Sequence, residues 1–173
     1  MTRIGLISDT HGLLRPQAAA FLESCDHIIH GGDVGPEEIL QQLALLAPVT
    51  AVRGNNDTES WARALPEARL MTVGAVQLYV IHDLAQMSIE PQAVAVAAVI
   101  SGHSHRPSIR ERDGVLYINP GSAGPRRFKL PIAVGELVIE GNSVSARIVE
   151  LPLPAVTGRA RRSATRPGPA ASE

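Results

Sequence analysis

Apolar and polar residues alternate in blocks along the first third of the chain, and each apolar block ends in a turn rich in glycine and polar side chains. Residues 4–7, 27–30 and 49–53 have the length and composition of strands. Residues 17–24 and 36–46 lie between them and show the apolar spacing and proline positions of helices. The three strand–helix alternations predict an α/β fold with parallel strands, in which sites form at the carboxyl ends of the strands.

The remainder of the chain has the pattern of hairpins rather than of strand–helix units. A further strand ends at Ile100 and is followed by Ser-Gly-His-Ser-His. Glycine-containing turns at 74–75, 113–114 and 141–142 separate short β-type runs. The hairpins predicted from these turns pair residues 70–73 with 76–82, 109–111 with 115–118, and 132–139 with 144–151.

The chain of 173 residues is long enough for one domain with a substantial core. We assign residues 1–151 to this domain. Residues 152–173 are rich in Pro, Ala and Arg and have no apolar periodicity, so we expect a disordered tail that serves as a solvated extension.

Composition excludes several classes of protein. The formal charge is −1 and aromatic residues make up 3%, which gives no reason to expect an obligate nucleic-acid or membrane partner. Cys25 is the single cysteine, so no internal disulfide is expected, and it reads as a small core residue. The sequence shows neither a signal peptide nor an apolar run of membrane-spanning length, and we expect a cytoplasmic protein.

Side chains that ligate metals follow five of the predicted strands. The first strand runs into Asp9 and His11, and alternation along an extended exit would point both side chains the same way. The full set of candidate ligands is Asp9, His11, Asp33, Asn55, His82, His103 and His105. Each has an ordinary structural alternative, such as a helix cap or a turn former, but five strand ends would have to acquire metal-type side chains by accident.

Mixed oxygen and imidazole ligands suit Mn²⁺, Fe or Zn²⁺ better than Mg²⁺ or Ca²⁺. Seven ligands are too many for one ion. Two ions that share one bridging carboxylate would each retain open positions for water and substrate, which is an arrangement used to cleave phosphate esters.

The ordered motifs resemble those of the calcineurin-like metallophosphoesterase superfamily, and within it the small single-domain bacterial and archaeal phosphodiesterases. The resemblance covers about residues 3 to 150 and implies a four-layer αββα sandwich of two stacked mixed sheets flanked by helices. The motifs that carry it are Asp9-x-His11, Gly32-Asp33, Gly54-Asn55-Asn56-Asp57, His82, Gly102-His103-Ser104-His105 and Asn119-Pro-Gly-Ser122.

Carried over, the resemblance implies that Asp9, His11 and His105 hold one ion, that Asn55, His82 and His103 hold the other, and that Asp33 bridges them. The candidate catalytic residues are Asp33, Asn55, Asn56 and Asp57. Our hypothesis is a phosphodiesterase that uses two divalent ions, Mn²⁺ first and Ni²⁺, Zn²⁺ or Fe as alternatives. A hydroxide bridging the ions would attack phosphorus in line with the leaving oxygen.

Two positions depart from the family pattern. The wider superfamily has a histidine that assists the leaving group where this chain has Asn56, and an amide cannot act as that acid. Asp83 stands where many members have glycine; it either orients His82 or is a tolerated turn residue. His30 is either a support behind the ligands or a strand histidine bonded to the backbone.

The group beyond the phosphate is not readable from one sequence, and a small phosphate ester is the expected substrate. Arg53, Arg106, Arg126 and Arg127 adjoin the motifs and are candidates for binding phosphate oxygens, although loop arginines are usually only solvated. A non-catalytic interaction scaffold is the alternative function, because the resemblance includes a retromer subunit with this fold. The sequence leaves open whether the chain forms a homo-oligomer.

Overall fold

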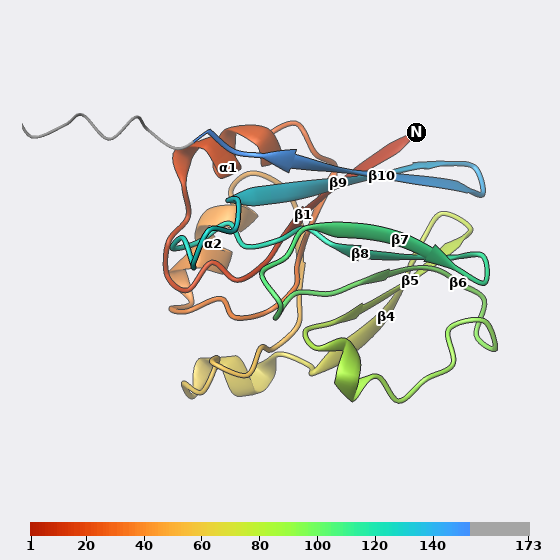
Figure 1. Ribbon diagram of the computed structural model, residues 1–173, viewed down its shortest axis with the longest axis horizontal. Helices are drawn as coiled ribbons and strands as arrows, with labels where there is room; N and C mark the ends of the chain where they lie inside the picture. The colour runs from red at the N-terminus through yellow and green to blue at the C-terminus, as the bar shows by residue number, and fades with distance from the viewer. Residues whose placement is uncertain (153–173) are drawn as a thin grey trace, which may run out of the picture.

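The computed structural model describes residues 1–152, which form two five-stranded β-sheets stacked face to face (Figure 1). The first sheet has the order β10-β9-β1-β2-β3. Its strands are β1 (Thr2–Ile7), β2 (His27–His30), β3 (Val49–Ala51), β9 (Ala133–Glu140) and β10 (Ser143–Glu150). The second sheet has the order β4-β5-β6-β8-β7. Its strands are β4 (Ala68–Val73), β5 (Val76–Ile81), β6 (Val96–Ile100), β7 (Ser108–Arg112) and β8 (Val115–Asn119).

Both sheets are mixed, and each contains three neighbouring parallel strands. Strands β1, β2 and β3 run parallel, as the strand–helix pattern predicts, and the hairpin β9–β10 adds antiparallel to β1. In the second sheet β5, β6 and β8 are parallel, and β4 and β7 pair antiparallel at the two edges. The carboxyl ends of five parallel strands therefore provide the loops in which the predicted ligands lie.

The core lies between the sheets and again beneath the helices. In β2, Ile29 packs between the sheets while its neighbour Ile28 packs against the helices. Burial on both faces explains why the central strands read as continuous apolar runs. Helices α1 (Pro16–Leu22) and α2 (Glu38–Ala44) cover the outer face of the first sheet.

The outer face of the second sheet is covered by a short 3₁₀ helix, η2 (Leu84–Gln86), and the loop after it. Met87 and Ile89 of that loop pack against Tyr79, which lies on this face of the sheet. The predicted four-layer sandwich is thus confirmed, and within residues 1–152 its fourth layer contains no α-helix.

Two local features differ from the sequence prediction. Strand β3 ends at Ala51 rather than at residue 53, because the backbone amide of Arg53 donates to Pro66 instead of extending the sheet. A second 3₁₀ helix, η1 (Trp61–Ala64), follows the third ligand loop and was not predicted. Among the described residues no helix has the length and apolarity needed to cross a membrane. The tail predicted for residues 152–173 lies, from residue 153 on, outside the described part of the chain.

Candidate metal centre

All seven predicted ligands lie together at one edge of the sandwich. They follow the carboxyl ends of β1, β2, β3, β5 and β6. Donor atoms of Asp9, His11 and His105 form one group, and donor atoms of Asp9, Asp33 and His82 form another; within each group all atoms lie within 4.8 Å of one another. The ligands come from both sheets, so the site depends on how the two sheets stack.

The first group is built around Asp9, whose side chain is fully buried. Its Oδ1 atom lies 3.2 Å from His105 Nε2 and 4.0 Å from His11 Nε2. The two imidazoles are stacked, with their Nε2 atoms 3.5 Å apart. Three donor atoms thus face a common point.

Asn55 and His103 lie next to His82 of the second group. Asn55 Oδ1 lies 3.1 Å from His82 Nε2 and 3.0 Å from His103 Nδ1. Asp33 joins the two groups, because its Oδ2 atom lies 3.4 Å from His82 Nε2 and 3.8 Å from His11 Nε2. This is the position that a bridging carboxylate requires.

The hydrogen bonds of His82 make this geometry suited to a cation. His82 Nδ1 lies 2.7 Å from the carbonyl oxygen of Gly31, so Nδ1 carries the proton and donates. When Nε2 is unprotonated, its lone pair faces Asp33 Oδ2 and Asn55 Oδ1, which are also acceptors. Burial favours the neutral ring, but the hydrogen bond to Asp33 raises the pKa of His82, so in the metal-free protein a proton on Nε2 occupies the place that a cation would take. Asp9 Oδ1 is likewise buried without any hydrogen-bond donor among the described residues. Acceptors that face one another in a buried site are satisfied by a metal ion.

Burial sets the protonation of these groups. It raises the pKa of the Asp9 carboxyl to about 6 and lowers the pKa of His105 to about 4, the latter with a further contribution from Arg127. Burial alone would raise the pKa of Asp33, but hydrogen bonds from His82 and Asn56 hold it below its ordinary value. Asp33 is therefore an anion with two histidines against it.

The ligands sit on strained backbone. Asp9, His11, Asp33, His103 and His105 all have positive φ, between 44° and 66°, in the left-handed region that non-glycine residues rarely adopt. Asp9 and His11 direct donor atoms to a common point as expected, but not by alternation along an extended exit, because β1 ends at Ile7 and both residues have left-handed φ. Such strain is typical of functional sites, where the surrounding structure maintains it.

Two glycines allow the loops to approach the carboxylates. A Cβ atom at Gly54 would collide with the side chain and backbone of Asp33, and one at Gly102 would collide with Ser8 and approach Asp9 Oδ2 to 2.9 Å. Only a hydrogen side chain fits at either position, which explains why these two loops have glycine beside Asn55 and His103.

Asp57 supports the loops instead of facing the centre. Its Oδ1 accepts from the backbone amides of Val34 and Gly35 at 2.8 and 3.2 Å, and its Oδ2 accepts from Gly54 at 2.8 Å. The carboxylate is buried and fully used by these donors. These contacts favour a supporting role over the predicted catalytic one, and we infer that Asp57 is a positioning residue that ties the Asp33 loop to the Asn55 loop.

His30 and Thr10 form a second support. Gly32 donates its amide to His30 Nδ1 at 3.1 Å, so the proton is on Nε2, which lies 2.9 Å from Thr10 Oγ1. The hydroxyl of Thr10 then donates to the carbonyl of Val34 at 2.8 Å. Complete burial lowers the pKa of His30 to about 3, which keeps the ring neutral. The chain joins the loop after β1 to the loop after β2.

Sequence reasoning missed the support given by the last turn of the site. Ser122 donates to the carbonyl of Asp9 at 2.9 Å, and Asn119 donates to the carbonyl of Gly102 at 2.6 Å. Ser8 donates to Asp9 Oδ2 at 2.7 Å, which leaves Oδ1 for the centre. The motif match at residues 119–122 was the one signal of this role.

The two residues that depart from the family pattern have clear contacts. Asn56 faces the bridge position, where its side-chain amide donates to Asp33 Oδ2 at 2.6 Å and its backbone amide to Oδ1 at 2.8 Å. Asp83 accepts from Ala85 at 3.0 Å and caps η2, and its Oδ2 lies 3.9 Å from His103 Nε2. The expected alternative that Asp83 orients His82 is therefore wrong, because Gly31 does so.

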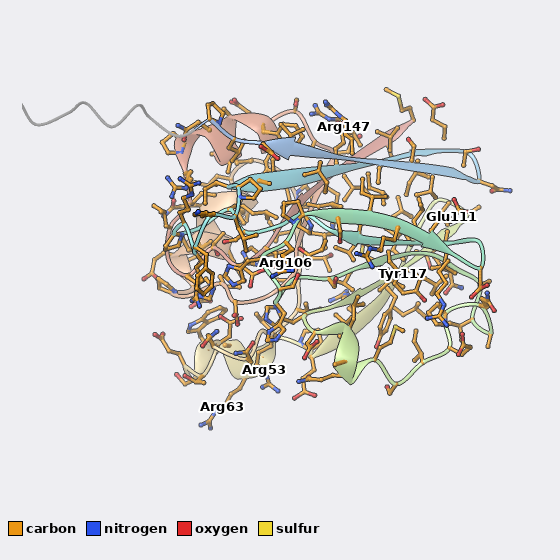
Figure 2. The ribbon with its side chains drawn as sticks, in the orientation of Figure 1. Arg53, Arg63, Arg106, Glu111, Tyr117 and Arg147 are labelled. Atoms are coloured by element: carbon orange, nitrogen blue, oxygen red, sulfur yellow. The ribbon has the colours of Figure 1, made fainter. Side chains whose placement is uncertain are left out.

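The four arginines differ in their surroundings. Arg127 Nη2 lies 3.5 Å from His11 Nε2, at the rim of the first group. Arg126 bonds to Leu130 in its own loop, and Arg53 forms an ion pair with Glu67. Arg106, labelled in Figure 2, follows His105. Its backbone amide donates to Ser104, and its guanidinium makes no ion pair or hydrogen bond with residues 1–152.

A two-sheet α/β sandwich with carboxylate and imidazole donors at its strand ends defines a metal-binding domain, and comparison with known proteins identifies its family. The family model described as the calcineurin-like phosphoesterase superfamily domain matches residues 2–142. A probable metallophosphoesterase of Methanothermobacter thermautotrophicus is 34% identical over 164 residues, which cover 87% of this chain and 94% of the relative. The chain therefore belongs to the calcineurin-like phosphoesterase superfamily.

Solved structures share the fold at lower identity. Vacuolar protein sorting 29 from Cryptosporidium parvum superposes with a TM-score of 0.74 at 19% identity, over 87% of this chain and 92% of that one. A structure described as a novel archaeal phosphodiesterase superposes with a TM-score of 0.70 at 24% identity, over 85% of this chain and 99% of that one. These likenesses extend the fold assignment across the whole described domain.

Proposed function

We propose that the protein is a phosphodiesterase that requires two divalent metal ions, with Mn²⁺ as the first candidate. The observation that carries the proposal is the position of Asp33 Oδ2, which lies 3.4 Å from a histidine of one group and 3.8 Å from a histidine of the other. Asp9, His11 and His105 would hold one ion, and Asn55, His82 and His103 the other. When bound, two such ions activate water and neutralise charge on the phosphoryl oxygens.

The residues of the chain position and polarise the site. The carbonyl of Gly31 accepts from His82 Nδ1, which leaves His82 Nε2 directed into the centre. The hydroxyl of Ser8 donates to Asp9 Oδ2, which leaves Asp9 Oδ1 directed into the centre. Arg127, beside His11, is placed to donate hydrogen bonds to a phosphoryl oxygen of the substrate. These contacts fix the geometry before the substrate arrives.

Asn56 determines which esters we expect to be cleaved well. Its amide is turned toward Asp33, and it has no group that titrates near neutral pH. The chain thus supplies no acid at this position for a poor leaving group. Esters of acidic alcohols, such as aryl diesters, should be cleaved far faster than esters of simple alkyl alcohols.

The test compares an aryl phosphodiester with the matching aryl phosphomonoester, using metal-stripped protein resupplied with Mn²⁺, Ni²⁺, Zn²⁺ or Mg²⁺. We expect metal-dependent turnover that favours the diester. Absence of turnover with every ion, although the ions bind, would contradict the proposal and favour a non-catalytic scaffold with the same fold.

A further inference from the structure

A cavity of about 410 Å³ lies beside the candidate metal centre, between the loop after β3, the 3₁₀ helix η1 and the 3₁₀ helix η2. Asn55 and His82 belong to its wall. Because both residues are candidate ligands, a phosphate held at the centre would have its remaining ester group at the entrance of this cavity. The volume is in the range of sites that bind small molecules. We call it the η1 cavity.

The side chains that line the η1 cavity all carry polar groups. None of the nine lining residues has an aliphatic or phenyl side chain. Thr58, from the loop after β3, and Gln86, from η2, contribute neutral hydrogen-bonding groups. A hydrocarbon group would desolvate these side chains without replacing their hydrogen bonds, so the cavity favours a hydroxylated or charged group.

Within residues 1–152, one cation of the lining has no ion-pair partner. Arg53 forms an ion pair with Glu67, and the carboxylate of Asp57 is used by three backbone amides. Arg63, on η1, makes no ion pair or side-chain hydrogen bond with any residue from 1 to 152. Figure 2 shows Arg53 and Arg63 near each other beside η1, and both line the cavity.

We propose that the η1 cavity binds a second anionic group of the substrate and that Arg63 recognises it. The substrate class is then a phosphodiester that carries a further phosphate or carboxylate on a hydroxylated moiety. This inference rests on the proposed function, since it places the scissile phosphate at the metal centre. Arg63 forms charge-assisted hydrogen bonds to the second group, while Glu67 keeps Arg53 from competing for it.

The test uses two aryl diesters that differ by one phosphate: thymidine 5′-(p-nitrophenyl phosphate) and its 3′-phosphorylated counterpart. The wild-type protein should have a KM about tenfold lower for the 3′-phosphorylated ester, as expected for charge-assisted contacts. Arg63→Gln should remove this difference by raising the KM for the 3′-phosphorylated ester. Glu67→Gln releases Arg53 and should lower the KM for the 3′-phosphorylated ester further.

Arg112→Gln is the matched control, because Arg112 is an exposed arginine paired with Asp113 in the β7–β8 hairpin and lies outside the cavity lining. It should retain the wild-type preference. Equal KM values for the two esters in the wild-type protein, or the same behaviour of Arg63→Gln and Arg112→Gln, would overturn the assignment of Arg63 while leaving the phosphodiesterase proposal intact.

Hydrolysis of neither ester would count against the proposed function, and the cavity is then tested by binding. Calorimetric titration of metal-free protein with thymidine 3′,5′-bisphosphate should show binding that Arg63→Gln weakens about tenfold and Arg112→Gln does not. No binding, or equal binding by all three proteins, would refute the role of the η1 cavity.

Discussion

Replacement of Asp57 by Asn tests whether the ligand loops are held together by this carboxylate. Asp57 is 5% exposed and accepts three backbone hydrogen bonds, two on Oδ1 and one on Oδ2. An asparagine can keep the oxygen that faces Val34 and Gly35. Its NH₂ group then faces the amide of Gly54, where two donors meet in a buried site.

The expected cost follows from these contacts. A hydrogen bond to a charged group contributes about 1.5–3 kcal/mol, and a buried donor left without an acceptor costs about 1–3 kcal/mol. We therefore expect Asp57→Asn to lower the free energy of unfolding by about 2–4 kcal/mol. Gly54 precedes Asn55, so metal affinity should also fall by about 10- to 100-fold, as it does when groups supporting ligands are removed.

Urea unfolding of the chelated protein, followed by circular dichroism, measures the first effect, and metal titration measures the second. Asp113→Asn is the control, because Asp113 lies in an exposed hairpin turn, where its side chain is 63% exposed. Its stability should stay within about 0.5 kcal/mol of wild type. If Asp57→Asn kept full stability and metal affinity but lost turnover, Asp57 would be catalytic and our reasoning about its contacts would be refuted.

Three further predictions concern neighbouring groups. The pKa of His30 is about 3 in the folded protein and near its ordinary value of 6.5 in the unfolded chain, so the unfolded chain binds the proton first as pH falls. Between these two values the free energy of unfolding should fall with pH by up to about 1.4 kcal/mol per pH unit. Urea unfolding at several pH values should show a smaller slope for His30→Gln. Gly54→Ala should abolish metal binding, measured by calorimetry, because the added methyl collides with Asp33; normal binding would show that the loop can move. In chelated protein, Arg127→Gln should raise the pKa of His105, measured by NMR titration, because Arg127 opposes its protonation; an unchanged pKa would contradict the placement of that guanidinium.

The α/β pattern with parallel strands and the location of the site could be predicted because they depend on local patterns, whereas the four layers were implied by the resemblance to the family. Apolar runs of strand length end at ligand-type side chains, and parallel strands bring their carboxyl ends to one edge. The sequence therefore placed Asp9, Asp33 and His82 at a common edge. Which atoms face one another could not be predicted, since that depends on how two sheets stack.

The supporting contacts were not readable because they join loops far apart in the chain. Asp57 bonds to the amide of Val34, 23 residues away, and Ser122 bonds to the carbonyl of Asp9, 113 residues away. Every residue other than proline carries the same backbone amide and carbonyl, so a sequence pattern does not show which of them a side chain will bind. The left-handed backbone of Asp9 and His11 was hidden for the same reason, since non-glycine residues seldom signal it.

The central claim is that Asp33 bridges two ions that together perform the hydrolysis. The most direct test titrates metal-free protein with Mn²⁺ and follows, in the same samples, the ions bound per chain and the turnover of bis(p-nitrophenyl) phosphate. We predict that turnover rises as the second ion binds and that Asp33→Asn loses both tight binding of the pair and turnover. Full turnover with one ion per chain, or an active Asp33→Asn variant, would contradict the account.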